Sequence, residues 1–238
     1  MGNTENRDLA WYNERIEYLR EFMTAERFQR LEQTIATRTR EMTILTENTF
    51  HSQNASALVR HCEAFGVQDV HAIESLCQFR TYTDIVRGTD KWVDLKHYDK
   101  TSDAIEALKA EGYRIVATTP HREDCTPETF DVTKGKFALV FGTEHAGISE
   151  DIIASADEFL RIPMCGMVES LNVSASAAIL IYMLSERLRN SSDDWHLSPL
   201  EQRELLFRWV MESIKDSENV LERKYPKEEH CKMVKPQY

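Results

Sequence analysis

The sequence has 238 residues, 42% of them apolar and 29% charged, and its 29 Lys and Arg against 40 Asp and Glu give a net charge of −11. A chain of this length can bury roughly 70–75% of its unfolded surface, so a soluble domain needs no disulfide or metal ion to hold it together. The negative charge argues against an enzyme that acts on nucleic acid, because binding phosphates ordinarily requires a basic surface.

Sequence patterns exclude two further classes. The longest apolar run, residues 177–184, is far shorter than the ~20 residues that cross a bilayer, and residues 1–12 hold no apolar signal core. The five cysteines are odd in number and include no Cys-x-x-Cys pair, which predicts neither a disulfide framework nor a zinc site. We therefore expect a cytoplasmic protein that binds no membrane and no metal ion.

Residues 1–41 predict a helical extension. Apolar side chains recur there at spacings of three and four residues, with arginine and glutamate between them, as on one face of a helix. They are Trp11, Ile16, Leu19, Phe22, Phe28, Leu31 and Ile35. The pattern changes near residue 42, where an alternation of strands and helices begins.

That alternation extends over residues 42–190. The predicted strands are 42–45, 70–73, 91–95, 114–118, 137–141 and 158–162, and the predicted helices are 55–65, 101–110, 149–156 and 174–188. Segment 137–141 is almost entirely apolar, which is typical of a parallel strand covered on both faces. Together these elements predict an α/β domain with a parallel sheet.

A second helical extension is predicted over residues 191–238. Ser198 and Pro199 begin a helix, with serine as its cap and proline in its first turn, and we expect the helix to reach residue 214. Two leucines, a tryptophan and a valine between 205 and 210 give it an apolar face. From Lys224 onward, the abundance of Lys, Glu and Pro predicts a loosely held tail.

Three segments place polar or glycine residues where the flanking pattern is that of a core. The first, residues 47–60, lies between a strand and a helix start and contains Asn54 and Arg60. Ligands of parallel α/β sheets bind outside the carboxyl ends of the strands, which places Asn54 well for a site. Taken alone, Asn54 could equally be a helix cap, and Arg60 a solvated charge.

The second segment, residues 141–149, also follows a predicted buried strand. Gly142 and Gly147 allow the backbone to approach a ligand closely, and Ser149 is suited to cap the next helix. The segment is neither a Gly-x-Gly-x-x-Gly nor a P-loop motif. Glu144 is a candidate functional residue, because a carboxylate at the carboxyl end of a strand is seldom needed for folding.

The third segment, residues 162–174, contains Ser170 and Asn172 within an otherwise apolar stretch. A helix start rich in small residues follows it. A tight loop before a core helix would explain the small residues, but it would not explain the two polar ones.

Together the three segments resemble the three motifs of the SpoU-type RNA ribose 2′-O-methyltransferases of the SPOUT class. The matching stretches, 54–67, 139–147 and 162–174, occur in the family's order within a similarity that runs from about residue 43 to 188. The helix with Arg30, the segment 91–93 and helical extensions at both ends further resemble members that methylate a guanosine in the D-loop of tRNA.

The resemblance implies a parallel sheet whose C-terminal part is threaded into a trefoil knot, an exception to the usual unthreaded connections. It also implies that S-adenosylmethionine binds in the knot, held mainly by backbone groups. The implied cofactor-binding residues are Thr118, Thr119, Gly142, Gly147, Ile162, Met164 and Leu171. Because the family works as a homodimer with its site at the interface, we expect Arg60 to act beside the cofactor of the neighbouring subunit.

The implied reaction moves a methyl group to a ribose 2′-hydroxyl, whose oxygen must lie about 3–3.5 Å from the methyl carbon. The residues implied at the reaction centre are Asn54, Arg60, Glu144, Ser170 and Asn172. In the family the arginine is assigned to activating the hydroxyl, but a guanidinium is almost never deprotonated. We therefore expect Arg60 to orient an RNA phosphate or to stabilise the developing alkoxide, with the other residues fixing Arg60, the ribose and the loops.

Two alternatives stay open. An RNA-binding or assembly module that kept the fold without catalysis would have a damaged cofactor site, whereas all three motifs are intact. A family member that acts on ribosomal RNA often carries a separate small N-terminal α/β domain, for which the forty helical residues at the start of this chain are too few.

The distribution of charge reconciles an acidic chain with an RNA substrate. Residues 27–60 hold five arginines and three glutamates, and the guanidinium fork binds two phosphate oxygens at once. The arginines predicted to contact RNA are Arg30, Arg38 and Arg40. We expect tRNA or ribosomal RNA to dock on a limited arginine-lined surface, with an affinity that falls as salt rises.

Overall fold

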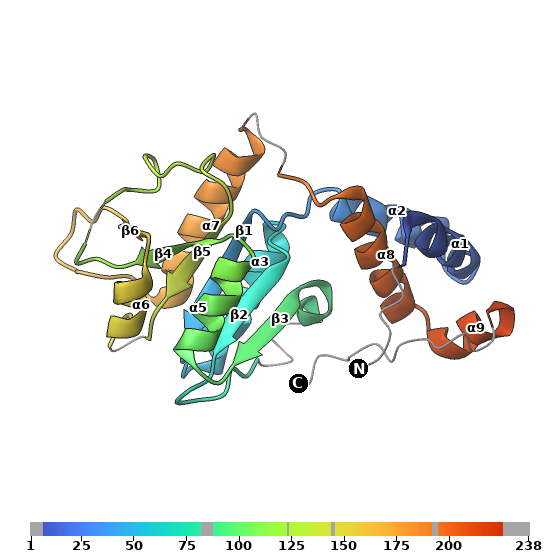
Figure 1. Ribbon diagram of the computed structural model, residues 1–238, viewed down its shortest axis with the longest axis horizontal. Helices are drawn as coiled ribbons and strands as arrows, with labels where there is room; N and C mark the ends of the chain where they lie inside the picture. Colours follow the sequence, from blue (N-terminus) through green and yellow to red (C-terminus); the bar gives the residue numbers. More distant parts are fainter. Residues whose placement is uncertain (1–6, 82–87, 123, 144–145, 192–194, 226–238) are drawn as a thin grey trace. The chain divides into compact units, whose positions relative to one another are not determined.

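A computed structural model describes residues 7–81, 88–122, 124–143, 146–191 and 195–225. The chain divides into two compact units: residues 39–195 form the sheet unit, and the terminal segments 1–38 and 196–238 together form the terminal unit. Figure 1 labels the helices and strands of both units. Among the helices described, none is both long and apolar enough to cross a membrane.

Within the described residues, the sheet unit contains a parallel sheet of six strands in the order β3-β2-β1-β5-β4-β6. The strands are β1 Met42–Glu47, β2 Asp69–Ile73, β3 Asp94–Tyr98, β4 Arg114–Thr118, β5 Phe137–Phe141 and β6 Glu158–Leu160. Each strand runs parallel to its neighbours. The predicted α/β class with a parallel sheet is confirmed, and the trefoil threading of its C-terminal part stays a prediction.

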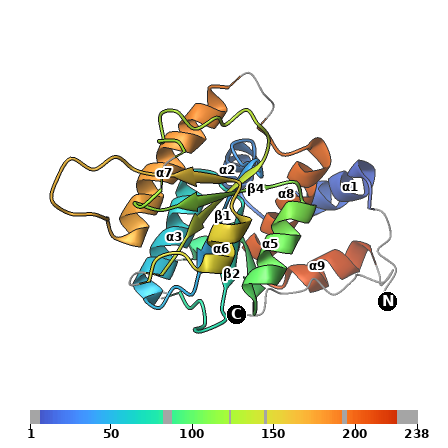
Figure 2. The ribbon, with the colours of Figure 1, turned by 60° about the vertical axis from the view of Figure 1, so that its left-hand side comes forward.

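Helices cover both faces of this sheet (Figure 2). They are α3 Ser52–Ala64, α5 Thr101–Ala110, α6 Glu150–Ser155 and α7 Val173–Arg189. α3 and α7 pack together on one face, where Ile44 of β1 joins their apolar cluster, whereas the next residue, Leu45, joins the cluster formed with α5 and α6. Successive strand residues therefore face opposite layers, which is why β5, in the middle of the sheet, is apolar throughout.

One strand begins later than the sequence pattern predicts. The pattern places a strand over 91–95, but the structure has the short 3-10 helix η1 Thr89–Trp92 followed by β3. The prediction for this segment is wrong because β3 carries a mixed polar sequence with no apolar run to mark it. Its bounds are set by pairing with β2, from Asp69 opposite Asp94 to Ile73 opposite Tyr98.

The terminal unit is helical. Its described helices are α1 Leu9–Arg20, α2 Ala25–Ile35, α8 Pro199–Ser213 and α9 Ser217–Lys224. α8 packs against both α1 and α2, so the two ends of the sequence share one core. Ser198 caps α8 as predicted: its hydroxyl accepts the N–H of Glu201, and the Glu201 carboxylate accepts the N–H of Ser198 in return.

α9 is an element that the sequence pattern does not predict. The pattern ends the preceding helix at residue 214 and expects a loose tail from Lys224. α9 lies between these points and buries Val220 and Leu221, and the Tyr18 hydroxyl of α1 donates a hydrogen bond to the Val220 carbonyl at 3.1 Å. The tail beyond residue 225 lies outside the described residues.

Candidate active site

A cavity of about 660 Å³ opens at the carboxyl ends of β4, β5 and β6, with walls from the loops that follow these strands and from the first turn of α7. This volume lies within the range of about 300–1,000 Å³ that is typical of ligand pockets. Every residue predicted to bind the cofactor lines the cavity: Thr118, Thr119, Gly142, Gly147, Ile162, Met164 and Leu171. The fold therefore brings together the segments that begin at Thr118, Phe141 and Phe159.

The loop after β5 is closed on itself. The Thr143 N–H donates to the Gly147 carbonyl at 2.8 Å, and the Gly147 N–H donates to the Thr143 carbonyl at 3.1 Å. Gly147 has a φ of +70°, a conformation that side chains with a Cβ rarely adopt. A Cβ at Gly142 would lie 2.2 Å from the Gly147 backbone, so only glycine fits there. Both glycines are needed for the shape of the cavity wall.

At the end of the cavity formed by Ser170 and Asn172, a side-chain hydrogen bond joins segment 162–174 to segment 47–60. Asn172 is the N-cap of α7, where its Oδ1 accepts the Ser174 N–H at 2.8 Å. Its Nδ2 donates to Oδ1 of Asn54 at 3.4 Å. Asn54 is buried in the first turn of α3, whose N-cap is His51, so the alternative role of Asn54 as a helix cap is excluded. Ser170 lines the cavity beside Asn172.

Arg60 lies apart from this cavity. It follows Asn54 by six residues on α3, has an exposed side chain and is not one of the cavity's lining residues. Burial, together with the neighbouring charge of Arg60, lowers the pKa of His61, which keeps that imidazole neutral at pH 7. Glu144 lies outside the described residues, so its role stays a prediction.

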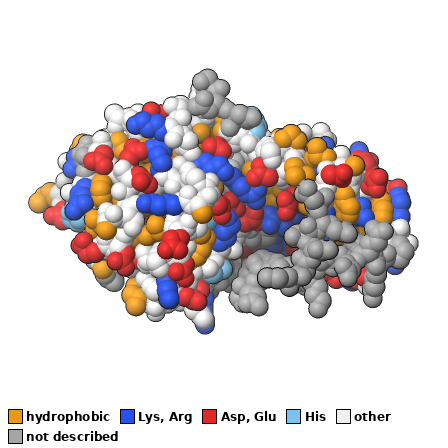
Figure 3. Space-filling model, in the orientation of Figure 1, with side chains coloured by type: hydrophobic (Ala, Val, Ile, Leu, Met, Phe, Trp, Pro, Cys, Tyr) orange, Lys and Arg blue, Asp and Glu red, His pale blue; other side chains and the backbone are white. Residues whose placement is uncertain are grey.

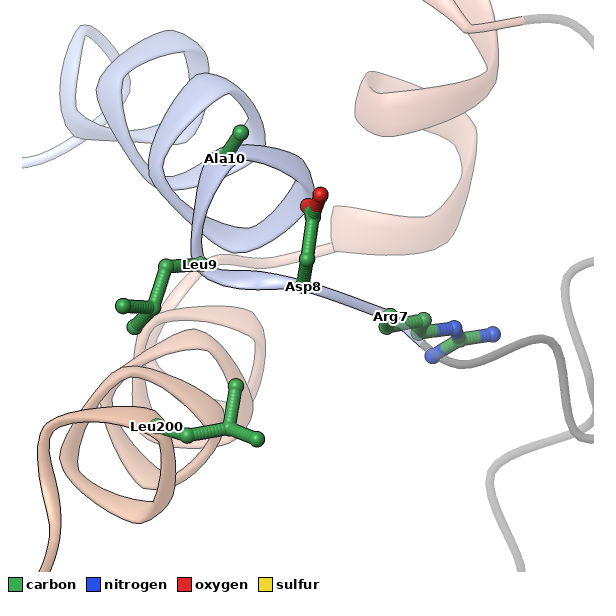
Figure 4. A pocket seen from close by; sticks show the side chains of 5 residues that line it. All are labelled: Arg7, Asp8, Leu9, Ala10 and Leu200. Atoms are coloured by element: carbon green, nitrogen blue, oxygen red, sulfur yellow. The ribbon is translucent and has the colours of Figure 1, made fainter.

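A second hollow, of about 500 Å³, lies in the terminal unit between the starts of α1 and α8 (Figure 4). It is lined by Arg7, Asp8, Leu9, Ala10 and Leu200. Its polar groups do not converge as those at the strand ends do, because Asp8 is the N-cap of α1 and accepts the Trp11 N–H. Among the described residues, no group of three or more His, Cys, Asp or Glu could hold a metal ion. The cavity of the sheet unit is therefore the better candidate for catalysis.

Residues 41–182 match the SpoU rRNA Methylase family. The chain belongs to this family. The resemblance drawn from the three motifs is thereby confirmed, and the cavity lies within the matched SpoU domain.

Similarity to known proteins extends beyond the SpoU domain. A tRNA (guanosine(18)-2′-O)-methyltransferase of Borreliella burgdorferi is 37% identical over 202 residues, which cover 85% of this chain and 92% of that protein. The structure of the A. aeolicus TrmH/SpoU tRNA modifying enzyme is 30% identical, with a TM-score of 0.70 over 80% of this chain and 98% of that one. The SpoU methyltransferase AviRb of Streptomyces viridochromogenes, in complex with AdoMet, shares the fold at 24% identity, with a TM-score of 0.55 over 68% of this chain and 62% of that one.

Two of the arginines predicted to contact RNA lie in the terminal unit, in different surroundings. Arg30 is exposed on α2. Arg38 is fully buried, and its guanidinium lies 5.1 Å from the centre of the Trp209 ring. The burial of Arg38 places it in the core of the unit, and we do not propose it as an RNA contact. A count of charges in the sequence does not distinguish these two environments.

The third arginine, Arg40, belongs to the sheet unit and is neutralised by two carboxylates. Its guanidinium lies 3.1 Å from Asp69 and 2.9 Å from Asp94. Figure 3 shows basic and acidic side chains interspersed over the face of the SpoU domain that it presents. Arg40 therefore adds little net positive charge to the surface of the SpoU domain.

The loop after β4 supplies two lining residues that the motifs do not indicate, His121 and Arg122. The Arg122 guanidinium lies 5.0 Å from the centre of the Phe159 ring on β6. The loop is tied to this strand because the Asp124 N–H donates to the Phe159 carbonyl and the Asp124 carboxylate accepts the Phe159 N–H, both at 2.9 Å. His121 and Arg122 could have been identified from their position just after the carboxyl end of a parallel strand.

Proposed function

We propose that this chain transfers the methyl group of S-adenosylmethionine to a ribose 2′-hydroxyl of tRNA, at a guanosine of the D-loop. One observation carries the proposal: a single cavity is lined by every residue predicted to bind the cofactor, and its polar end is joined to Asn54. The names of relatives such as the one from Borreliella burgdorferi support tRNA as the substrate.

The cavity suits S-adenosylmethionine chemically. Its apolar residues, Ile162, Met164 and Leu171, offer contacts for a flat purine, and Gly142 and Gly147 let the backbone of the loop after β5 approach the ligand closely. No side chain could stand at Gly142 without displacing this loop. When bound, S-adenosylmethionine supplies a methyl group on a positively charged sulfur.

The residues of this chain would orient the ribose and favour loss of its proton. Asn172 is held by both α7 and Asn54, so its position at the end of the cavity is fixed before RNA binds. Because a guanidinium is a poor proton acceptor, Arg60 would act by charge: it would orient a phosphate of the RNA or stabilise the alkoxide that develops on the 2′-oxygen. Ser170 and Glu144 would hold the ribose and the loops around it.

A second copy of the chain would bring Arg60 to the reaction. The outer face of α7 exposes Ile179 and Tyr182, and the Tyr182 ring lies 5.5 Å from that of Phe65, which follows α3. This apolar face beside the helix of Arg60 is suited to a homodimer interface. In such a dimer, Arg60 of one subunit completes the cavity of the other, in the cytoplasm where tRNA is modified.

The helical terminal unit favours tRNA over ribosomal RNA as the substrate. Similarity to the Borreliella burgdorferi protein covers 85% of this chain, whereas the SpoU domain spans residues 41–182 alone, so the relative also matches part of the terminal helices. Arg30 on α2 is exposed and would contact the RNA backbone.

Labelled S-adenosylmethionine, offered to the purified protein with either bulk tRNA or ribosomal RNA, tests this proposal. We expect the label on the 2′-oxygen of a D-loop guanosine of tRNA, and we expect its loss in Arg60→Ala. Label in ribosomal RNA alone would favour the alternative in which the chain methylates ribosomal RNA. If calorimetry detects no binding of S-adenosylmethionine, the chain is an RNA-binding module instead.

A further inference from the structure

Glu47 is a buried carboxylate that none of the roles above uses. It is the last residue of β1, in the middle of the sheet, and its side chain is 4% exposed. Because Thr46 pairs with Phe141 of β5, Glu47 lies where β5 leads into the loop that begins at Gly142. A buried charge is costly unless it is paired or hydrogen-bonded, so its partners indicate its purpose.

The two carboxylate oxygens of Glu47 accept hydrogen bonds from two different elements. Oε2 accepts the backbone N–H of Ser149 at 3.0 Å, and Oε1 accepts the hydroxyl of Thr101 at 3.3 Å. Thr101 is the first residue of α5, and Ser149 is the N-cap of α6. One side chain therefore joins β1, α5 and the loop after β5.

The loop that Ser149 terminates is closed at its ends. Two backbone hydrogen bonds between Thr143 and Gly147 close the segment 143–147 into a ring, and Gly142 packs against the Gly147 backbone without room for a Cβ. The position of this ring is therefore set at its two ends, by β5 before it and by Ser149 after it. Gly142, Thr143 and Gly147 line the cavity, whereas Glu47 and Thr101 do not.

We propose that Glu47 is a positioning residue for the cofactor: by accepting the Ser149 N–H, it holds the ring 143–147 where the ring forms the cavity wall. This inference rests on the proposed function, because it gives the cavity to S-adenosylmethionine. Alanine at position 47 would remove the acceptor of both bonds. Glutamine would not, because its oxygen can accept the Ser149 N–H while its NH₂ group donates to the Thr101 hydroxyl, which also accepts.

A matched pair of variants at Ser149 isolates the hydrogen bond. Ser149 has a φ of −67°, which proline adopts without strain. Ser149→Ala removes the hydroxyl that accepts the Ile152 N–H as the cap of α6 but keeps the backbone N–H that reaches Glu47. Ser149→Pro removes the hydroxyl and the N–H together. The difference between the two variants therefore reports on the bond to Glu47.

The readout is calorimetric binding of S-adenosylhomocysteine to the full-length protein. We expect Glu47→Ala to weaken binding about tenfold relative to wild type, which corresponds to ~1.4 kcal/mol. Ser149→Pro should weaken it by the same factor relative to Ser149→Ala. The double variant should be no weaker than either single one, because both changes break the same bond. Thr101→Val, which removes only the other bond, should stay within about twofold of wild type, and affinity for tRNA should be unchanged in all five variants.

A purely structural Glu47 would give a different pattern. It would lower the melting temperature without changing the affinity of the folded protein for S-adenosylhomocysteine, and that result would overturn the inference. Additive losses in the double variant would also overturn it. If Glu47→Ala does not fold, the Ser149→Pro and Ser149→Ala comparison decides alone. Failure of the wild type to bind S-adenosylhomocysteine would instead contradict the proposed function.

Discussion

The terminal unit and the SpoU domain use arginine for different purposes. In the terminal unit, Arg15 is buried between two aromatic rings, 3.9 Å from the centre of Trp11 and 4.4 Å from that of Tyr225. In the SpoU domain, Arg60 is exposed on α3. A guanidinium stacks well on aromatic faces because it is planar and weakly hydrated, so it serves a core as readily as it binds phosphate. Arginine content alone therefore overstates the surface available to RNA.

The two regions should also respond differently to mutation. The SpoU domain builds much of its cavity from the loops that follow β4, β5 and β6, so changes there should alter cofactor binding or catalysis more than stability. The terminal unit is held together by buried rings and guanidinium groups, so changes to these should alter stability more than chemistry.

The largest expected effect is that of Arg60→Ala. The variant should lower the rate of methyl transfer by about 10³-fold, because the charge that stabilises the alkoxide or orients the RNA is gone. Its affinity for S-adenosylhomocysteine should equal that of the wild type. Single-turnover kinetics with saturating tRNA measure the rate. Near-normal transfer by a variant that still dimerises would remove Arg60 from the reaction.

Gly142→Ala should weaken binding of S-adenosylhomocysteine by about 100-fold, because the new Cβ would lie 2.2 Å from the Gly147 backbone and force the ring 143–147 to move. Gly166→Ala is the matched control, since a Cβ at Gly166 meets no atom within 4 Å. Calorimetry on both variants makes the comparison. Equal losses of affinity at Gly142 and Gly166 would contradict the prediction, because they would show that the close contact of Gly142 with the Gly147 backbone makes no difference.

In the terminal unit, Arg38→Ala should lower the free energy of unfolding by about 2 kcal/mol, because a fully buried side chain stacked on Trp209 is lost. The rate of methyl transfer by the folded variant should be unchanged. Urea denaturation measures the stability of the variant. A variant of wild-type stability that binds tRNA poorly would instead restore Arg38 as an RNA contact.

Arg30→Ala should show the opposite behaviour. Arg30 is exposed, so its removal should leave stability unchanged, weaken tRNA binding about threefold to tenfold and reduce the salt dependence of that binding by about one unit of slope. Filter binding at several salt concentrations measures this slope. An unchanged slope would place Arg30 outside the RNA interface.

The last expected effect is a pH dependence of stability that belongs to the SpoU domain. Burial, and more weakly the Lys96 charge, lowers the pKa of His71 to about 3, and its Nδ1 lies 2.9 Å from the Tyr98 hydroxyl. Below about pH 6.5, His71 takes up a proton in the unfolded chain but stays neutral in the folded one. Stability should therefore fall from pH 6.5 toward pH 3, by at most ~1.4 kcal/mol per pH unit from this residue. The buried arginines of the terminal unit keep their charge over this range.

His71→Asn tests this assignment. The free energy of unfolding of the variant should depend less on pH between 7 and 5 than that of the wild type, because carboxylates contribute equally to both. Identical slopes in urea denaturation would assign the acid sensitivity to other groups.

Local signals in the sequence sufficed for much of the sheet. The strands 114–118 and 137–141 and the helix 101–110 have the predicted bounds, because apolar runs or a helical period end there at turn residues. The pattern misplaced β3, whose bounds depend on pairing with β2, and missed α9, which depends on Tyr18 of α1.

The site shows the same division. The second and third motifs indicated lining residues such as Gly142 and Asn172, because glycines and polar residues interrupt a core pattern there, whereas Thr118 and Thr119 were implied by the family resemblance. The bond from Ser149 to Glu47 and the burial of Arg38 join residues far apart in the chain, so no local pattern could reveal them.

The central claim is that the cavity of one chain and Arg60 of another form one active site. Mixed dimers of Arg60→Ala and Gly142→Ala chains test it directly, because each dimer would contain one intact cavity faced by one intact arginine. We expect methyl transfer to tRNA by the mixture that neither variant achieves alone. A mixture as inactive as its separate components would contradict the account.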